Sequence, residues 1–262
     1  MSVSRQLGKR LKPKGNIMIE LDKIYNQDCL EGMRQIPDGS IDAVICDLPY
    51  GTTHNTWDVL IPFDELWREY HRIAKPTAPF IMFGSEPFSS VMRMSNLKEY
   101  RYDWIWQKSQ GADFLNVKRR PLKNFETISV FCRRRAPYNP QGLRPCHRVK
   151  DNASKFGNNS REWNHADSYV QEYENYPQAI IKYDDDPDAW HPTQKPVDLL
   201  RYLVLTYTNE GDTVLDNCMG SGTTAIACIK EKRHFIGFEL SKEYFDKAQR
   251  RIKAEQAQLT LF

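Results

Sequence analysis

A strand–turn–helix pattern near the end of the chain constrains the fold most strongly. Val214-Leu215-Asp216 is typical of the end of a buried strand, and Gly220-Ser221-Gly222 follows as a turn that leads into Thr223-Thr224-Ala225. The stretch fits Gly-x-Gly-x-x-Ala, in which the glycines let the backbone approach a ligand closely before a helix begins. It predicts an α/β sheet with a nucleotide-type ligand at the carboxyl end of this strand.

An acidic residue ends the next strand-like run, Phe235 to Phe238. Glu239 stands about where a carboxylate would accept a hydrogen bond from a ribose hydroxyl. A P-loop is not indicated, because no lysine follows the second glycine as Gly-Lys-Ser/Thr requires. The two features together favour a ligand that contains a nucleoside.

A second strand ends in Asp47-Leu48-Pro49-Tyr50. The preceding run, Ile41 to Cys46, is short, apolar and rich in branched residues, as in a buried strand. Pro49 cannot continue a strand ladder, and Gly51 then frees the backbone. A carboxylate with nearby carbonyls suits an amino group, and the tyrosine offers a stacking face. The alternative is a strand end with a turn and a hydrogen-bonded aspartate.

These stretches resemble motifs of the amino-methyltransferases that act on DNA with S-adenosylmethionine. Residues 47–50 are similar to their catalytic Asp/Asn/Ser-Pro-Pro-Tyr/Phe motif, and residues 216–224 to their cofactor loop, Asp-Pro-Phe-x-Gly-Ser-Gly-Thr-Thr. The catalytic motif comes first, which is the order of the circularly permuted beta group. The resemblance covers most of the chain. Leu48 replaces the first proline of the catalytic motif, and Asn217-Cys218 replaces Pro-Phe of the loop.

The resemblance implies further cofactor contacts. Asp28 would meet the adenine amino group of the cofactor, and it could at the same time cap the helix that starts there. His191-Pro192-Thr193-Gln194-Lys195-Pro196 resembles the family segment that starts a helix beside the methionine part of the cofactor, and Pro196 suits a first helical turn. The candidate cofactor-binding residues are Asp28, Thr193, Gln194, Lys195, Asp216, Gly220, Ser221, Gly222, Thr223, Thr224 and Glu239.

The expected fold is α/β: a doubly wound, mostly parallel Rossmann-like methyltransferase sheet with helices on both faces and an inserted target-recognition region. We expect strands at 80–83, 104–106 and 127–131, a helix at 63–73 and a last helix from Ser241 toward 256. The expected domains are a basic arm at 1–15, a catalytic half at 16–135, the target-recognition region at 136–190, a cofactor-binding half at 191–257 and a C-terminal tail at 258–262.

Composition excludes some classes of protein. The sequence has no apolar run long enough for a membrane span and no signal peptide at its start. Its six cysteines form no Cys-x-x-Cys pair, which favours reduced thiols in a cytoplasm, that of a bacterial or phage-infected cell, and no metal site. The formal net charge of +3 does not by itself indicate a nucleic-acid partner.

The distribution of charge does indicate double-stranded DNA. Residues 105–150 contain eleven lysines and arginines against two acids, Asp113 and Glu126. Such an excess suits phosphate neutralisation, although a solvated charged face would also produce it. The candidate DNA-binding residues are Lys118, Arg119, Arg120 and Lys123.

The predicted reaction is methyl transfer to the exocyclic N6 amine of an adenine that has been flipped out of the DNA, with Asp47, Leu48, Pro49 and Tyr50 as catalytic residues. In the resembling family an aspartate at the first motif position usually accompanies adenine, which leaves N4-cytosine as the second candidate base. C5-cytosine methylation would need a Pro-Cys nucleophile. Pro145-Cys146 has these letters, but we expect it in a basic loop far from a strand end like that of Asp47, so we reject this reaction. The residues leave open a methyltransferase for RNA or protein amines, a dehydrogenase, and a non-catalytic DNA-binding module.

The end of the chain resembles the Gln-Leu-Ser/Asp-Leu-Phe peptide with which bacterial replication proteins bind the sliding clamp. Gln258, Leu259, Leu261 and Phe262 match it. Bulky apolar residues at a chain end either pack back on their own domain or anchor a partner.

Overall fold

The computed structural model describes residues 19–51, 59–151, 168–186, 189–191 and 193–259. The basic arm at 1–15, residues 152–167 of the expected target-recognition region, Pro192, and residues 260–262 of the tail lie outside the described residues, as does the side chain of Leu259.

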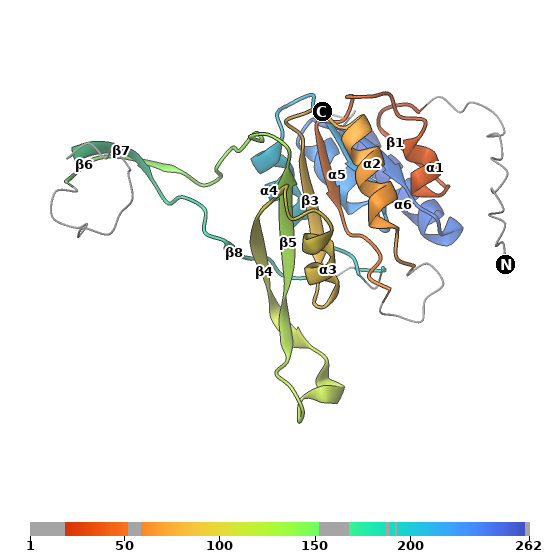
Figure 1. Cartoon of the computed structure of the whole chain (residues 1–262), viewed down its shortest axis with the longest axis horizontal. Coiled ribbons are helices and arrows are strands. Elements are labelled where there is room, and N and C mark those ends of the chain that lie inside the picture. Colours follow the sequence, from red (N-terminus) through yellow and green to blue (C-terminus); the bar gives the residue numbers. More distant parts are fainter. Residues whose placement is uncertain (1–18, 52–58, 152–167, 187–188, 192, 260–262) are drawn as a thin grey trace, which may run out of the picture.

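Eight strands form one large sheet (Figure 1). In spatial order they are β1 (Lys23–Tyr25), β10 (His234–Phe238), β9 (Thr213–Asp216), β2 (Ala43–Cys46), β3 (Pro79–Gly84), β5 (Lys123–Cys132), β4 (Tyr100–Ala112) and β8 (Ile180–Lys182). The strands from β1 to β3 are parallel, β5 is antiparallel to both of its neighbours, and β8 is parallel to β4. The predicted mostly parallel sheet is confirmed.

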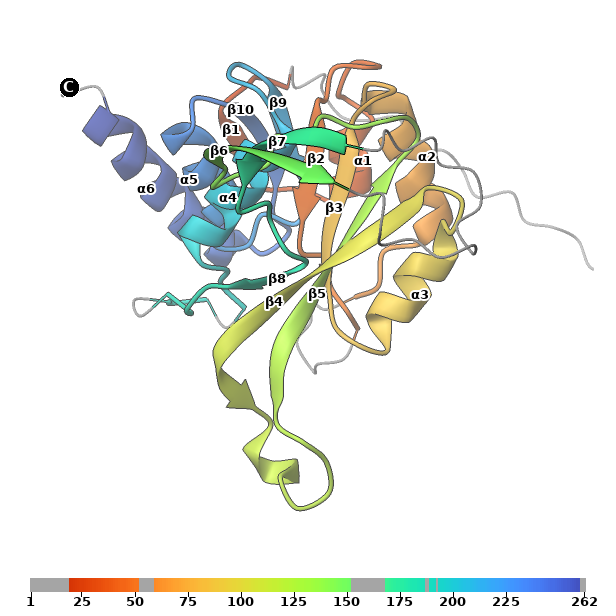
Figure 2. The ribbon, with the colours of Figure 1, turned by 90° about the vertical axis from the view of Figure 1, so that its left-hand side faces the viewer.

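Helices cover both faces of the sheet, as Figure 2 shows. One face carries α1 (Cys29–Met33), α2 (Phe63–Ile73) and α3 (Phe88–Ser95), and the other carries α4 (Val197–Tyr207), α5 (Thr223–Lys230) and α6 (Lys242–Leu259). Each face encloses its own apolar core, because successive strand residues point to opposite sides. In β2, for example, Val44 packs against the first group of helices and Ile45 against the second.

The helix predicted at 63–73 forms because its apolar residues recur at helical spacing. Leu66, Tyr70 and Ile73, the predicted stripe, are all buried, and Trp67 joins them. Asp64 and Glu65 occupy the first turn of α2, where negative charge is favoured by the helix dipole.

The two strands that carry the sequence motifs are neighbours. β2 pairs in parallel with β9, with Ala43 opposite Val214 and Val44 opposite Leu215. The residues that follow these two parallel strands, Asp47 and Asn217, therefore lie at the same edge of the sheet. The expectation that the strands of the two motifs lie side by side is confirmed.

Two hairpins project from the body (Figures 1 and 2). β4 and β5 continue beyond the sheet and end in a short 3₁₀ helix, η1 (Phe114–Asn116). β6 (Arg144–Asp151) and β7 (Ser168–Glu174) form a separate two-stranded sheet. Sequence analysis missed the long β4–β5 hairpin, because each strand was recognised only where it is buried and apolar.

β8 lies inside the segment 136–190 and pairs with β4 in the main sheet. One further expectation needs correction. Pro145-Cys146 lies in strand β6, not in a loop, and the Cys146 thiol donates to the carbonyl of Gln171 at 3.1 Å. Among the described residues, no helix has the length and apolar character needed to cross a membrane.

Candidate active site

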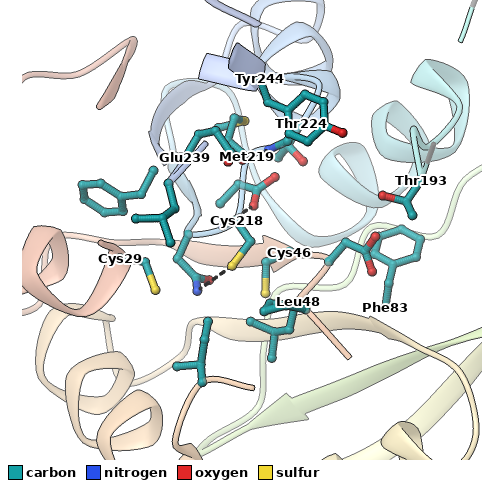
Figure 3. Close-up of a pocket in the computed structure, with 18 of the residues that line it drawn as sticks. Cys29, Cys46, Leu48, Phe83, Thr193, Cys218, Met219, Thr224, Glu239 and Tyr244 are labelled. Carbon is teal, nitrogen blue, oxygen red and sulfur yellow. Dashed lines mark hydrogen bonds between the residues drawn. The ribbon is translucent and has the colours of Figure 1, made fainter. Parts of the chain in front are cut away.

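A cavity of about 440 Å³ opens at the carboxyl edge of the sheet. Its walls come from the ends of β2, β9 and β10, from the start of α1, and from the segment before α4. Figure 3 shows Glu239 and Met219 toward one end and Phe83 and Thr193 toward the other, with Cys46, Leu48 and Cys218 between them. The topology thus gathers segments that are far apart in the sequence around one cavity.

Asp47 is held in place on both of its carboxylate oxygens. The hydroxyl of Tyr50 donates to Oδ1 at 2.6 Å, and the ammonium group of Lys195 lies 2.5 Å from Oδ2. Tyr50 stacks on Phe88, with ring centroids 4.7 Å apart. One face of the tyrosine ring is therefore supported by protein, and its hydroxyl fixes the aspartate.

Lys195 connects Asp47 to a second carboxylate that sequence analysis did not assign to the site. Its Nζ lies 3.3 Å from Glu126 Oε2, and Lys108 lies 2.7 Å from Oε1 of the same glutamate. Burial raises the pKa of Asp47, although Lys195 opposes that shift. Burial also opposes charge on Lys195, but Asp47 and Glu126 outweigh it and raise the pKa of the lysine. The lysine is therefore charged at neutral pH.

The remaining two residues of the tetrapeptide, Leu48 and Pro49, also line the cavity. Leu48 is buried and belongs to the apolar core beneath α1 and α2. The leucine that replaces a proline of the family motif thus fits a space that is already apolar.

The glycine loop has the backbone that its sequence predicts. Gly220 and Gly222 both have positive φ, 51° and 81°, and Gly222 is the N-cap of α5. A Cβ at position 222 would come within 3.3 Å of Ile252. The absence of a side chain at Gly222 therefore allows α5 and α6 to pack closely. Gly222 is not among the described residues that line the cavity. Gly220, Ser221, Thr223 and Thr224 do line the cavity.

Glu239 directly follows β10 and lines the cavity. Its carboxylate accepts hydrogen bonds from the backbone N–H groups of Gly220, at 2.8 Å, and Ser241, at 2.7 Å. Burial raises its pKa, and these amides oppose the shift. Glu239 therefore ties the glycine loop to the start of α6 while it lines the cavity.

Asp28 and Asp216 line the same cavity. Asp28 Oδ1 accepts from the amides of Leu30 and Glu31, at 2.9 and 3.1 Å, so its predicted capping role is confirmed. Asp216 is 4% exposed, and burial raises its pKa to about 7. The amide of Cys218 donates to Asp216 Oδ1 at 3.1 Å.

Some residues of the segment before α4 line the cavity, and others bond to neighbouring parts of the chain. Thr193 lines the cavity, whereas Gln194 is not among the described lining residues, and its amide donates to Asp186 at 2.7 Å. Pro196 is the N-cap of α4 and has an extended ψ of 136°, so it precedes the first turn. Burial and two nearby lysines lower the pKa of His191 to about 4, so its ring is neutral at physiological pH.

Sequence analysis missed several residues of the cavity wall. Three of the six cysteines, Cys29, Cys46 and Cys218, come together there, although they are scattered along the chain. Phe83 and Tyr244 also line the wall, and no local motif marks them. Glu126, which contacts Lys195 beside the cavity, was also missed. Its sequence did carry a signal, because Glu126 is an isolated acid within a basic stretch.

The candidate DNA-binding residues lie on the β4–β5 hairpin and are all exposed. Arg120 pairs with Asp113, and the Lys123 ammonium contacts the Ser85 hydroxyl. Arg120 and Lys123, together with Tyr50, line a second cleft of about 400 Å³. The cleft thus links the turn of the β4–β5 hairpin to Tyr50 of the tetrapeptide.

A Rossmann-like sheet with an acidic cavity beside an Asp-x-Pro-Tyr strand end defines the methyltransferase class of α/β proteins. The model of a family described as DNA methylase, whose members modify N6 or N4 amines, matches residues 41–250. This match covers most of the chain, and the chain belongs to that family.

Similarity to individual proteins agrees with this family assignment. The chain is 28% identical to the type II methyltransferase M.HinfI of Haemophilus influenzae, over 92% of this chain and 70% of that protein. It is 27% identical to M1.MboII of Moraxella bovis, over 88% of this chain and 96% of that protein. Its fold resembles the M1.HpyAVI–SAM complex, with 25% identity, a TM-score of 0.60, and coverage of 87% and 98%. The cytosine-N4-specific PvuII methyltransferase shares the fold at 15% identity, with a TM-score of 0.63 and coverage of 90% and 91%.

Proposed function

We propose that the chain transfers a methyl group from S-adenosylmethionine to the exocyclic N6 amine of an adenine in double-stranded DNA. The observation that carries this proposal is the adjacency of β2 and β9. Asp47 and Tyr50 at the end of one strand face the cavity formed by the glycine loop at the end of the other. An acceptor for the target amine and a pocket for the methyl donor therefore meet at one edge of the sheet.

The cavity suits the cofactor in size and charge. Its described lining contains four carboxylates, Asp28, Asp47, Asp216 and Glu239, against one lysine, an excess that favours a cationic ligand. Apolar walls from Phe238, Met219 and Leu240 suit the purine ring of the cofactor. Glu239 would accept from the ribose and Asp28 from the adenine amine, with Thr193, Thr223 and Thr224 near the amino-acid part. When bound, the cofactor supplies an activated methyl group on a sulfonium.

Asp47 and its neighbours would make the target nitrogen a better nucleophile. The lone pair of an exocyclic amine is delocalised into the ring, so hydrogen bonds from its N–H groups to Asp47 and the Leu48 carbonyl favour a pyramidal nitrogen. The same contacts stabilise the positive charge that develops as the methyl group arrives. Tyr50, supported from behind by Phe88, offers its other face to the flipped base. Holding the reacting centres in line supplies much of the remaining acceleration.

The choice of adenine rests on Asp47 as the first residue of the tetrapeptide, and N4-cytosine is the second candidate. The test incubates the protein with labelled cofactor and DNA, identifies the modified nucleoside and sequences its context. N6-methyladenine is the expected product. N4-methylcytosine would overturn the choice of base. Cofactor binding without transfer to DNA would favour the non-catalytic DNA-binding module.

The segment 136–190 supplies a candidate reader of the target sequence. The β6–β7 hairpin projects from the body and carries Arg144, Arg148 and Lys150 beside exposed Val149 and Tyr169 (Figure 1). A two-stranded ribbon fits the major groove of B-DNA, where the edges of all four base pairs can be distinguished. Exchanging this hairpin with that of a relative of different specificity should transfer the recognition sequence.

A sliding clamp is a further proposed partner, through the C-terminal tail. α6 continues to Leu259, beyond the helix end expected near residue 256, so Gln258 belongs to its last turn. Binding as an extended peptide would require that turn to unwind, which costs little at a fraying helix end. The test titrates purified clamp with intact protein and with protein lacking 258–262. Equal binding by both, or by neither, would end the proposal, and a lower melting temperature of the truncated protein would favour a packed tail.

A further inference from the structure

The β4–β5 hairpin extends past the edge of the sheet that carries the catalytic site. Thr127 in β5 pairs with Gly84, the last residue of β3, so residues 113–126 lie beyond the carboxyl end of the parallel strands. At about 3.3 Å per residue, the strand from Lys123 to Thr127 carries the hairpin roughly 13 Å past that edge. This reach exceeds the ~8.5 Å depth of the DNA major groove.

The tip of the hairpin presents apolar side chains to water. Leu115 is fully exposed, at 100%, and Phe114 and Val117 are 68% and 52% exposed. They are held on a folded turn, because Asp113 accepts from the Asn116 amide at 2.7 Å and pairs with Arg120. Apolar side chains held outward in this way indicate a contact surface.

The surroundings of these apolar residues carry positive charge. Lys118, Arg119 and Arg120 follow directly and are exposed. Behind the tip, Arg120 and Lys123 share a cleft with Tyr50. A phosphate backbone that follows these cations would bring a duplex to the catalytic tyrosine.

We propose that the hairpin tip enters the DNA duplex beside the target base, and that Phe114 and Leu115 fill the space which the flipped base leaves. This inference rests on the proposed function, which requires an extrahelical base. Extruding a base costs unstacking energy, and an apolar wedge between base steps offsets that cost, as in DNA-bending proteins. Lys118 and Arg119 neutralise the flanking phosphates.

A protein partner fits these observations less well. A stable protein interface buries about 800 Å² on each partner, and three side chains at a hairpin tip provide much less. A wedge needs one or two apolar side chains surrounded by cations, which is what the tip provides.

The test compares wild type with a variant that carries Phe114→Ser and Leu115→Ser, on two duplexes that contain the methylation site identified by sequencing. In one duplex the target base is paired, and in the other it faces a mismatch that leaves it already unpaired. On the paired duplex the single-turnover rate of the variant should fall by about tenfold or more, because extrusion loses its wedge. On the mismatched duplex the rate should return to within about twofold of wild type, because little unstacking remains.

Leu97→Ser is the matched control. Leu97 is 59% exposed, but it precedes β4 at the opposite edge of the sheet, so its loss should change neither rate. A variant that methylates the paired duplex as fast as wild type overturns the wedge. Equal loss on both duplexes also overturns it, because the tip would then act only in binding. Loss of a dimer in the variant, measured by sedimentation, would assign the tip to a second copy instead. Absence of methylation by wild type itself would mark the failure of the proposed function.

Discussion

The ammonium group of Lys195 lies 2.5 Å from Oδ2 of Asp47, the acceptor proposed for the target amine. Lys195 is 8% exposed and also contacts Glu126, so it is a fixed part of the site. It occupies an oxygen that the incoming amine would use. Lys195 favours the ionised form of the half-buried Asp47. In the proposed mechanism, Glu126 can hold the lysine when the amine arrives.

Asp47→Ala should reduce methyl transfer by at least about 10²-fold, the typical cost of losing one preorganised transition-state contact. Cofactor affinity, measured by calorimetry, should remain close to wild type, because Asp47 is assigned to the amine. Asp42→Ala is the control: Asp42 pairs with Lys75 at the other end of the same strand, so its loss should leave kcat intact. Near-normal turnover of Asp47→Ala would contradict the mechanism.

Lys195→Met should shift the acid limb of the pH–rate profile upward by about one to three units, the usual effect of a nearby opposite charge. In the proposed mechanism Asp47 accepts from the amine as a carboxylate, so activity is expected above the pKa of Asp47 and is lost as pH falls through it. Among the described residues, Lys195, Tyr50, Glu126 and Asp216 act on Asp47. Removing the lysine leaves burial and the like charge of Glu126, which raise the pKa of Asp47, opposed only by the Tyr50 hydrogen bond. Lys195→Arg, which keeps the charge, should restore much of the profile. An unshifted acid limb in Lys195→Met would refute this role.

Asp216→Asn should make folding stability less dependent on pH. The folded-state pKa of Asp216 is raised from 3.8 to about 7 by burial. The folded state therefore binds the proton more tightly than the unfolded state, and the stability from this group is lost as pH rises from about 4 to 7. Denaturant unfolding at several pH values should show the variant gaining stability relative to wild type across this window. Parallel pH curves would show that Asp216 has an ordinary pKa.

Glu239→Ala should weaken cofactor binding by about 1.5–3 kcal/mol, the worth of a hydrogen bond to a charged group. The variant would lose the proposed hydrogen bond to the ribose and also the two hydrogen bonds that the carboxylate accepts from backbone amides. Glu243→Ala, which removes an exposed glutamate paired with Lys247 on α6, is the matched control and should have no effect. Unchanged affinity by calorimetry would remove Glu239 from the site.

Neutralising Arg119, Arg120 and Lys123 together should lower DNA affinity and flatten its dependence on salt, by roughly 0.9 in the slope for each lost phosphate contact. Lys253→Ala, an exposed lysine on α6, should leave the slope unchanged. The measurement is a series of binding titrations across salt concentrations. An identical slope in the triple variant would indicate a solvated charged face.

Local patterns in the sequence predicted much of the fold. The strands predicted at 41–46 and 80–83 are observed at 43–46 and 79–84, and the amphipathic helix 63–73 and the glycine turn at 220–222 are also present. These elements depend on apolar spacing and on backbone freedom at glycine, which are properties of short stretches. The long β4–β5 hairpin escaped notice, because its outer half is polar and lacks the alternation that marks a half-buried strand.

What the sequence alone determined is the set of local groups: an acid and a tyrosine after one strand, and a glycine turn before one helix. The tertiary structure decided which side chains meet. Lys195 was predicted from the family motif to bind the cofactor, yet its ammonium group lies on Asp47 and Glu126, carboxylates 148 and 69 residues away in the chain. A buried charge needs an opposite charge, and sheet order decides which one is in reach. β2 and β5 flank β3 and direct both carboxylates to the same edge, and no short stretch of sequence encodes that order.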